Sequence, residues 1–596
     1  MAKRIKCLAF TRRGGLILGL VLLSVQFGHE LTAEGLCKAA PALASQEAAG
    51  ADVYPYRWVY VSRSLDSDSD IRDIEGIVRT ASEHGLNGMV LTGGLEYLDT
   101  NPPQYFKRLE EVKQICGRHN IEIIPIIFSV GYGGSVLSCD KNLAAGIAVK
   151  DASFVVENGK VHPPRRASLA ADPVVQIVNG GFEEYNGNRL AGYEFHDRPG
   201  EVSYVDREVF KSAPASLRFE NFGKYEYGHA RVMQEVAVHS LRCYRLTCWV
   251  KTEQLEPADS FRLQVLSVDG RSLAPWDPGI AATTDWRRVV MGFNSFNCDK
   301  VRIYVGAWGG KSGKFWVDDL QLEEVGLLNI LRRPGTPLIV RGEETQSLYQ
   351  EGKDFAEVRD PKLNFRFDHQ LPELVILPGS KIKNGERLRI SYYHGMAINN
   401  GQVTVCMSEP KLYEIWEKEA QLIQKHLAPA RYLFSMDEIR AGGACEACKS
   451  RKMTMAQILG DCITRQVGII RKVNPRAEVF IWSDMLDPNH NAHADYYLVD
   501  GDFTGSWNYI PKDLIIVCWY YEKRNESLKF FSSLGFKTLA GAYYDGGTLD
   551  NPVGWLEALR RTPQACGIMY TTWQNKYQLL APFGDLVINP NLKTQN

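Results

Sequence analysis

The sequence predicts an α/β fold, namely a (β/α)8 barrel of the TIM type with an antiparallel β-sandwich (jelly roll) inserted into it. Three observations support this. Short apolar runs alternate with amphipathic helical patterns from residue 54 to about 165, the periodicity changes to twos between 172 and 326, and the first pattern returns after residue 400. Three predicted strands before the insertion and five after it make eight βα units.

The N-terminal segment, residues 1–45, has the residue order of an export signal and a linker. Five Lys and Arg side chains precede the apolar run "GGLILGLVLLSVQFG", and the small-residue stretch "APALAS" follows. This order is typical of export signals, and the run is short for a membrane span. We therefore expect a periplasmic, cell-surface or secreted protein without stable membrane insertion after signal removal, with an uncleaved anchor as the alternative.

The N-terminal half of the barrel is predicted over residues 52–168. "RWVYVSRSL" reads as the first strand, and a helical face over residues 70–84 follows it and ends at Gly85. "LNGMVLTGG", the helix "PPQYFKRLEEVKQICGRHN" and the strand "IEIIPIIFSVGYGG" complete this half. Continuous apolar strands between amphipathic helices are typical of a parallel sheet that is covered on both faces.

The insertion occupies residues 172–326, where segments such as "YRLTCWVKT", "FRLQVLSV" and "VRIYVGAW" alternate polar and apolar residues. This pattern predicts an antiparallel sandwich of one-domain size. Residues 327–400, rich in Pro, Gly and charge, fit either a small β subdomain or a long decorated loop.

The C-terminal half of the barrel is predicted over residues 401–590 and contains the catalytic residues. A helix over residues 410–427 precedes the strand "RYLFSM", and a second helical face ends at Asn474 and Pro475. Four further strands are predicted at "AEVFIWSDM", "DLIIVCW", "KTLAGAYYD" and "CGIMYTTW".

Carboxylates, aromatic side chains and an arginine follow the predicted strands, and in such barrels the carboxyl ends of the strands carry the chemistry. Tryptophan faces stack on sugar rings, and glycosidic cleavage needs a carboxylic acid whose pKa is raised. Glu438 is the candidate acid, because the neighbouring charge of Asp437 and partial burial disfavour its ionisation. The predicted rim contains Arg63, Asp437, Glu438, Trp482, Asp484, Trp519, Tyr543, Tyr544, Asp545 and Trp573.

From "VCMSEPKLYEIWEKEAQLIQKHLAPARYLFSMDEIR" through "VFIWSDM", "AYYD" and "MYTTWQN", the chain resembles family 20 glycoside hydrolases, the β-N-acetylhexosaminidases. The resemblance implies that Glu438 is the acid/base and that Asp437 orients the substrate's 2-acetamido group, whose carbonyl is the internal nucleophile. It also implies that Tyr543 bonds the acetamido oxygen and that Asp545 bonds a sugar hydroxyl. The substrate-binding residues that we expect are Arg63, Trp482, Asp484, Asp545, Trp573, Asn575 and, by a weaker match, Trp519.

The chain departs from the family pattern at several positions. "LFSM" replaces His-x-Gly-Gly before the acid pair, Tyr60 replaces an aspartate, and Asn575 stands where an acid often follows the last tryptophan. A second hypothesis is therefore a glycosidase on a sugar without the acetamido group, with Asp545 or Asp484 as nucleophile or base. A third is a carbohydrate-binding surface protein without catalysis.

The predicted sandwich resembles carbohydrate-binding modules of the family 4 and 9 type, through "VNGGFEE", "ASLRFEN" and "KFWVDDLQLEE". The resemblance implies a structural calcium ion near the ends of the module, with Glu183 and Asp319 as ligands; no cofactor is expected for catalysis. A sandwich that packs on the barrel without sugar affinity is the alternative. The expected partner is thus an oligosaccharide or polysaccharide, and the net charge of −1 gives no basic field for nucleic acid.

Cys445 and Cys448 form the one locally suggestive cysteine pattern, "CEAC". A single CxxC is weak evidence for zinc. A disulfide that staples a loop and two ordinary buried thiols are the other interpretations.

Overall fold

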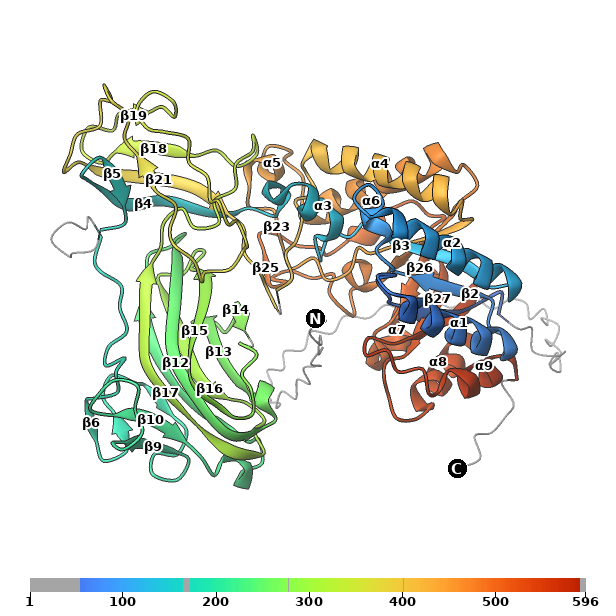
Figure 1. Cartoon of the computed structure of the whole chain (residues 1–596), viewed down its shortest axis with the longest axis horizontal. Coiled ribbons are helices and arrows are strands. Elements are labelled where there is room, and N and C mark those ends of the chain that lie inside the picture. Colours follow the sequence, from blue (N-terminus) through green and yellow to red (C-terminus); the bar gives the residue numbers. More distant parts are fainter. Residues whose placement is uncertain (1–53, 165–171, 277, 400, 590–596) are drawn as a thin grey trace, which may run out of the picture.

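The computed structural model describes residues 54–164, 172–276, 278–399 and 401–589. It consists of a barrel, a two-sheet sandwich and a third, smaller β domain (Figure 1). The predicted export signal lies outside the described residues. Within the described ranges, none of the helices combines the length and apolarity that crossing a bilayer requires.

The barrel is closed, and its eight strands are parallel, as predicted. The last strand pairs with the first, so the sheet has no open edge. In order around the barrel the strands are β1 (Tyr56–Val61), β2 (Gly88–Leu91), β3 (Glu122–Ile127), β22 (Arg431–Phe434), β24 (Glu478–Trp482), β26 (Ile515–Cys518), β27 (Lys537–Tyr543) and β28 (Ala565–Thr571).

Side chains alternate between the inside and the outside of the barrel. Along β1, Trp58 and Tyr60 belong to the cluster that fills the barrel interior. Val59 and Val61 belong to the larger cluster between the strands and the helices. Because both faces of each strand are buried, the strands read as continuous apolar runs in the sequence.

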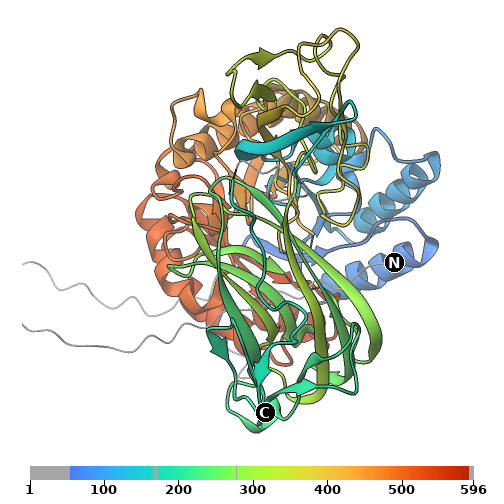
Figure 2. The ribbon, with the colours of Figure 1, turned by 90° about the vertical axis from the view of Figure 1, so that its left-hand side faces the viewer.

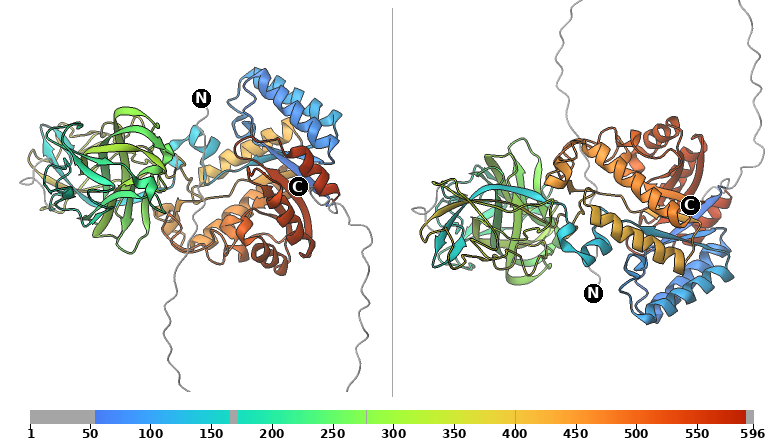
Figure 3. Two further views of the ribbon diagram at one scale, coloured as in Figure 1. Left: turned by 90° about the horizontal axis from the view of Figure 1, so that it is seen from below. Right: turned by 90° about the horizontal axis from the view of Figure 1, so that it is seen from above.

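Helices cover the outside of the barrel, as Figure 3 shows from below and above. The helix Asp68–Glu83 begins with a capping box at Ser67, and the helix Met455–Val473 begins with another at Thr454. Capping boxes satisfy backbone N–H groups that a helix start leaves unpaired. The covering helices are α1 (Asp68–Glu83), α2 (Pro103–Arg118), α4 (Pro410–His426), α6 (Met455–Val473), α7 (Arg524–Ser533), α8 (Asp550–Arg560) and α9 (Leu580–Ile588).

The connection from β24 to β26 differs from the predicted βα repeat. Besides the short strand β25 (Leu498–Val499), its regular structure consists of two single 3-10 turns, η5 (Asp484–Leu486) and η6 (Ser506–Asn508). Its sequence, "SDMLDPNHNAHADYYLVDGDFTGSW", is rich in Asp, Asn, His and Gly and has no helical apolar period. Such residues compete for backbone hydrogen bonds and favour turns over helix.

The inserted sandwich is present and antiparallel. Its two five-stranded sheets have the orders β15-β12-β17-β10-β9 and β14-β13-β16-β11-β8 and enclose their own core. In Figure 2 the sandwich lies in front of the barrel. The strands are β8 (Phe195–His196), β9 (Ser203–Asp206), β10 (Ser216–Phe219), β11 (Ala230–Ala237), β12 (Cys243–Glu256), β13 (Phe261–Ser267), β14 (Ser272–Trp276), β15 (Thr284–Asn294), β16 (Lys300–Ala307) and β17 (Ser312–Glu324).

A six-stranded sheet forms the third domain, with the order β19-β18-β21-β4-β5-β20. Its long central strands, β4 (Ile147–Glu157) and β21 (Arg387–His394), are antiparallel and come from opposite sides of the sandwich sequence. The predicted N-terminal half of the barrel, 52–168, therefore contains strands that belong to another sheet, and residues 327–400 contribute to a real β subdomain. The other strands are β5 (Lys160–His162), β18 (Ile339–Gly342), β19 (Leu348–Tyr349) and β20 (Leu374–Val375).

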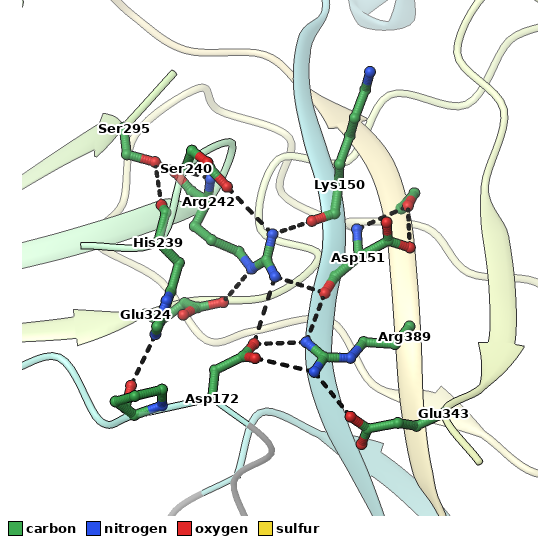
Figure 4. A network of polar contacts seen from close by, with 12 residues as sticks. Lys150, Asp151, Asp172, His239, Ser240, Arg242, Ser295, Glu324, Glu343 and Arg389 are labelled. Atoms are coloured by element: carbon green, nitrogen blue, oxygen red, sulfur yellow. Dashed lines mark hydrogen bonds and ion pairs between the residues drawn. The ribbon is translucent and has the colours of Figure 1, made fainter. Parts of the chain in front are cut away.

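A polar network joins this sheet to the sandwich (Figure 4). Arg242, which precedes β12, donates through Nη2 to the carbonyl of Asp151 in β4 at 2.7 Å and lies 3.5 Å from Asp172. Asp172 also pairs with Arg389 of β21 at 2.6 Å. Both arginines thus share one carboxylate across the boundary between the two domains.

Candidate active site

The Asp437–Glu438 pair lies just beyond the carboxyl end of β22, as predicted. Glu438 has a φ of 52°, a left-handed conformation that is uncommon for a residue with a side chain. Two side chains hold its backbone in place. Asp484 Oδ2 accepts from the Glu438 N–H at 2.8 Å, and Gln402 Nε2 donates to the Glu438 carbonyl at 2.8 Å.

Gly131 makes room for this turn of the chain. A Cβ at residue 131 would lie 2.0 Å from the Asp437 carbonyl oxygen and 2.8 Å from that of Glu438. Only glycine permits so close a backbone approach. The loop after β3 therefore packs directly against the acid pair.

The carboxylate of Glu438 is compensated by a cation. Its Oε1 lies 2.8 Å from Nη2 of Arg440, and its Oε2 accepts a hydrogen bond from the hydroxyl of Tyr132. Both members of the ion pair are largely buried, with side-chain exposures of 12% for Glu438 and 5% for Arg440. Desolvation lowers the pKa of Arg440, and the negative charge of Glu438 is the largest of the effects that raise it. The net pKa is raised, which agrees with a tight ion pair.

Asp437 has a different environment. Its side chain is half-buried and accepts from Ser435 Oγ at 3.0 Å. Burial, together with the negative charge of Glu438, raises the pKa of Asp437 to about 6. Asp437 can therefore hold and release a proton close to neutral pH.

Two further carboxylates lie close enough for their charges to interact with Asp437. Asp484 is fully buried, and burial followed by the charge of Asp437 raises its pKa to about 8. Burial also raises the pKa of Glu96 to about 7, although the backbone N–H groups of Ser135 and Ser129 counteract it. Interacting carboxylates of this kind share protons as a group.

Aromatic side chains lie at the same end of the barrel. Tyr60, Trp482 and Trp573 form a triangle, with ring centroids 5.1 Å apart for Tyr60 and Trp573, 6.1 Å for Trp482 and Trp573, and 6.5 Å for Tyr60 and Trp482. Trp519 stacks parallel to Tyr544 at 6.3 Å, and Tyr544 lies 6.3 Å from Trp573. Trp573 and Tyr544 are 37% and 36% exposed, so their rings are accessible to a ligand.

Arg63 and Asn575 meet at the rim. Nη1 of Arg63 donates to Asn575 Oδ1 at 2.5 Å, and the guanidinium carbon lies 5.8 Å from the ring centroid of Tyr577. The structure thus brings these two predicted substrate-binding residues together. Trp482 and Trp573 also come together, as described above.

Tyr543 is placed differently from the prediction. It is 2% exposed, stacks on Tyr570 at 4.1 Å, and packs in the cluster between strands and helices. It is Tyr544, the next residue, whose ring reaches the exposed aromatic group. Residues 543, 544 and 545 all have positive φ values, of 82°, 57° and 61°, and this breaks the two-residue alternation of the strand.

Asp545 has a structural set of partners. Its carboxylate accepts from Thr572 Oγ1 at 2.5 Å, from the Trp573 N–H at 2.8 Å and from the Gln574 N–H at 3.3 Å. Asp545 therefore links the end of β27 to the segment that carries Trp573.

Sequence reasoning missed several residues that contact the acid pair. Arg440 was within reach of a sequence argument, because it stands two residues after Glu438 in "DEIR". Tyr132, in "GYGG", comes from a neighbouring strand end. Gln402 gave no signal, since it lies in the segment that returns from the insertion.

The predicted calcium ligands do not form a group of metal-binding side chains. Asp319, in β17, accepts from Ser212 Oγ at 2.6 Å, and Glu183 is exposed. In the part of the chain that the structure describes, three cysteines are the one group of three or more His, Cys, Asp or Glu side chains that could hold a metal. A calcium ion at Glu183 and Asp319 would need backbone carbonyls as its other ligands, and this site stays a prediction.

Comparisons with known proteins found no matching family model and no matching curated protein. Among solved structures, a chitobiase of Flavobacterium johnsoniae is similar over 89% of this chain and 48% of its own, at 7% identity and a TM-score of 0.33. A rhamnosidase of Novosphingobium sp. PP1Y is similar over 87% of this chain and 55% of its own, at 8% identity and a TM-score of 0.33. A family 61 carbohydrate-binding module in complex with β-1,4-galactotriose matches 24% of this chain and 95% of its own, at 16% identity and a TM-score of 0.20. At these scores the function has to be derived from the site itself.

Proposed function

We propose that the chain is a glycoside hydrolase that cleaves β-linked N-acetylhexosamine from a glycan or polysaccharide by substrate-assisted retaining catalysis. One observation carries the proposal: the Asp437–Glu438 pair lies beyond the carboxyl end of β22, at the barrel end that holds exposed aromatic rings, and the pKa of Asp437 is raised. Burial is the main cause of the raised pKa of Tyr60, and the negative charge of Asp437 is the next. The side chains of Tyr60 and Asp437 therefore lie near one another.

This combination suits a sugar substrate. Aromatic faces stack on the C–H faces of a pyranose ring, and a few polar groups bind its hydroxyls. A carboxylic acid that is still protonated near neutral pH can protonate the leaving oxygen of a glycosidic bond. Arg63 and Asn575, joined at the rim, are the polar groups that we assign to sugar hydroxyls.

The state of the other carboxylates favours a nucleophile that belongs to the substrate. Asp484 is fully buried and is occupied by the Glu438 N–H and by Asn491 Nδ2 at 2.9 Å. Asp545 is occupied by three donors of the neighbouring segment. Because neither is free to attack an anomeric carbon, the alternative with Asp545 or Asp484 as nucleophile or base on a non-acetamido sugar has less support.

The roles within the acid pair can be assigned from their charges. The sequence assigns the acid to Glu438 and the acetamido contact to Asp437. In the structure Arg440 pairs with Glu438 at 2.8 Å, and burial with the charge of Glu438 raises the pKa of Asp437 to about 6. We therefore assign proton donation to Asp437 and the electrostatic support of the developing cation to Glu438, and keep the reverse assignment as the alternative that the next experiment separates.

The experiment compares Asp437→Asn and Glu438→Gln on aryl β-N-acetylglucosaminides with good and poor leaving groups. A leaving group that needs no proton bypasses the general acid. We expect Asp437→Asn to lose on the order of 10²- to 10⁴-fold in kcat/KM on the poor leaving group and much less on the good one. The wild-type kcat should also fall as the pH rises through about 6, where Asp437 loses its proton.

Glu417→Gln, a surface carboxylate of α4 paired with Lys472, is the matched control and should keep wild-type activity. If the leaving-group dependence belongs to Glu438→Gln instead, the two roles are exchanged. Binding of hexosaminides without turnover by the wild-type protein would contradict the proposal and favour a carbohydrate-binding surface protein. A covalent glycosyl-enzyme trapped on Asp545 would contradict substrate assistance.

Three further aspects of the proposal concern the rest of the chain. We assign sugar binding to the sandwich as a carbohydrate-binding module, a structural calcium ion to Glu183 and Asp319, and export to the N-terminal segment. Carbohydrate-binding sandwiches use exposed aromatic side chains for contact. Trp286 and Trp308, both half-buried, are two tryptophans of the sandwich on which to test this.

A further inference from the structure

Three cysteines from two separate segments meet beside the barrel. Cys406 lies where the chain returns from the insertion towards α4, Cys445 directly precedes the short helix α5 (Glu446–Lys449), and Cys448 lies within that helix. Their sulfur atoms are 3.5 Å (Cys406 to Cys445), 3.7 Å (Cys406 to Cys448) and 3.8 Å (Cys445 to Cys448) apart. All three residues are buried, at 2%, 1% and 3% exposure.

These distances fit shared coordination of one ion. A disulfide would place two sulfurs about 2.05 Å apart, and within the described residues all cysteines are free. Thiolates at about 2.3 Å from a tetrahedral zinc ion have an edge length of about 3.8 Å between sulfurs. The three observed separations lie close to that edge, and no pair is singled out as a disulfide would require.

The surroundings suit negatively charged sulfur. The buried side chain of Arg333, 5% exposed, donates to Cys445 Sγ at 3.8 Å and pairs with Glu409 at 2.8 Å. A thiolate is the form in which cysteine binds metal.

We propose that Cys406, Cys445 and Cys448 bind one soft divalent metal ion, Zn²⁺, with the fourth position taken by a ligand from solvent. Binding replaces three thiol protons, which pass to the solvent, by three metal–sulfur bonds, and no electron is transferred. The ion would tie the segment that follows Gln402 to the loop that follows Arg440. Both of these residues contact Glu438, so the ion stabilises the loop on which the acid pair depends.

The test measures zinc bound to the full chain, purified without chelators from cells that export it. We expect about one zinc ion per chain in the wild-type protein and at least a tenfold loss in Cys406→Ser and in Cys448→Ser. Cys116→Ser is the matched control, because Cys116 is a buried thiol of α2 outside the group, and it should keep its zinc. Exchange of zinc for Co²⁺ in the wild-type chain should give a thiolate-to-cobalt charge-transfer absorption, which does not depend on the folding of any variant.

Two results would overturn the proposal. One is a wild-type chain without zinc in which mass spectrometry after alkylation finds a disulfide between two of the three cysteines. The other is a wild-type chain that takes up neither zinc nor cobalt, from solutions of these metals alone, and whose three thiols all react with the alkylating agent once it is unfolded.

Discussion

At the acid pair, Arg440 forms its ion pair with one of several neighbouring carboxylates. Arg440 is committed to Glu438 at 2.8 Å, and Asp437 and Asp484 are left to interact with one another in a buried setting. Buried carboxylates without a cation keep their protons to higher pH. The proton that Asp437 would donate thus follows from the pairing of Arg440 with Glu438 and not with Asp437.

Replacing Asp484 tests this charge balance through stability. The pKa of Asp484 is about 8 in the folded chain, against an ordinary value of 3.8. Between pH 4 and pH 8, therefore, the folded state holds a proton on Asp484 that the unfolded state has released. The wild-type free energy of unfolding therefore falls as pH rises from about 4 to about 8, with a contribution from this group of up to about 1.4 kcal/mol per pH unit. Asp484→Asn removes that slope, which urea unfolding at several pH values measures.

Asn keeps an acceptor oxygen for the Glu438 N–H, so the variant is expected to fold. Asp513→Asn, an exposed member of an ion pair with Arg471, controls for the loss of one carboxylate. An equal pH slope in wild type and Asp484→Asn would show that Asp484 is ionised in the folded chain and would contradict the assignment.

At the residue scale the sequence predicts the acid pair and the aromatic residues but not their orientation. Whether the ring of Tyr543 or that of Tyr544 reaches the exposed aromatic side chains depends on the left-handed backbone of residues 543 to 545. Glycine is the residue type that usually signals such a backbone, and in "AYYDGG" the glycines come only after these three residues. The ion pair of Glu438 with Arg440 depends likewise on the left-handed φ of Glu438, which turns the chain after the strand.

At the element scale, the ends of β27 and β28 act as one unit through Asp545. Its carboxylate collects donors from three consecutive residues, 572 to 574, and so sets the position of Trp573. Trp573 is the exposed ring of the aromatic triangle. The position of Trp573, just after β28, therefore depends on a side chain that follows β27.

Asp545→Ala and Asp545→Asn separate this positioning role from a nucleophilic one. Asn keeps one acceptor oxygen and should retain most of the activity, whereas Ala leaves the donors to water and should raise KM severalfold with a stability loss of about 1 to 2 kcal/mol. Steady-state kinetics and thermal unfolding of both variants measure this. If Asp545 were the nucleophile, both variants would lose kcat by a similar, very large factor.

The barrel strands could be predicted because each is a short apolar run buried on both faces, and the covering helices because of their amphipathic period. The connection after β24 could not be predicted as a repeat unit. Counting strands implies a helix there, but "DPNHNAHAD" supplies turn-forming residues instead.

At the scale of the whole molecule, one insertion lies within another. The chain leaves the barrel after β3, forms β4 and β5, builds the sandwich, completes the third sheet with β21 and then returns to the barrel. The sequence shows the sandwich by its periodicity. It does not show that β4 and β21 pair, because their residues, for example Ala152 and Ile390, lie more than 200 positions apart along the chain.

The nested arrangement makes the junction between the sandwich and the third sheet important for the whole chain. Arg242 bonds the β4 carbonyls of Lys150 and Asp151 and pairs with Glu324 at 3.2 Å (Figure 4). Its side chain is 9% exposed. Removing one partner of such a buried network leaves charged and polar groups without compensation.

We expect Arg242→Met, which keeps an unbranched stem without the charged guanidinium, to destabilise this junction by about 3 to 5 kcal/mol. Because the sandwich has its own core, it should unfold or move separately, so calorimetry should resolve a second transition and a protease should cleave near residue 172 sooner. Arg198→Met is the matched control: Arg198 belongs to an exposed pair with Glu201 in the sandwich, with side-chain exposures of 55% and 60%. Exposed pairs contribute about 0 to 1 kcal/mol, so this variant should unfold like the wild type. A single unshifted transition in Arg242→Met would mean that the sandwich is held to the third sheet by apolar packing and not by the network.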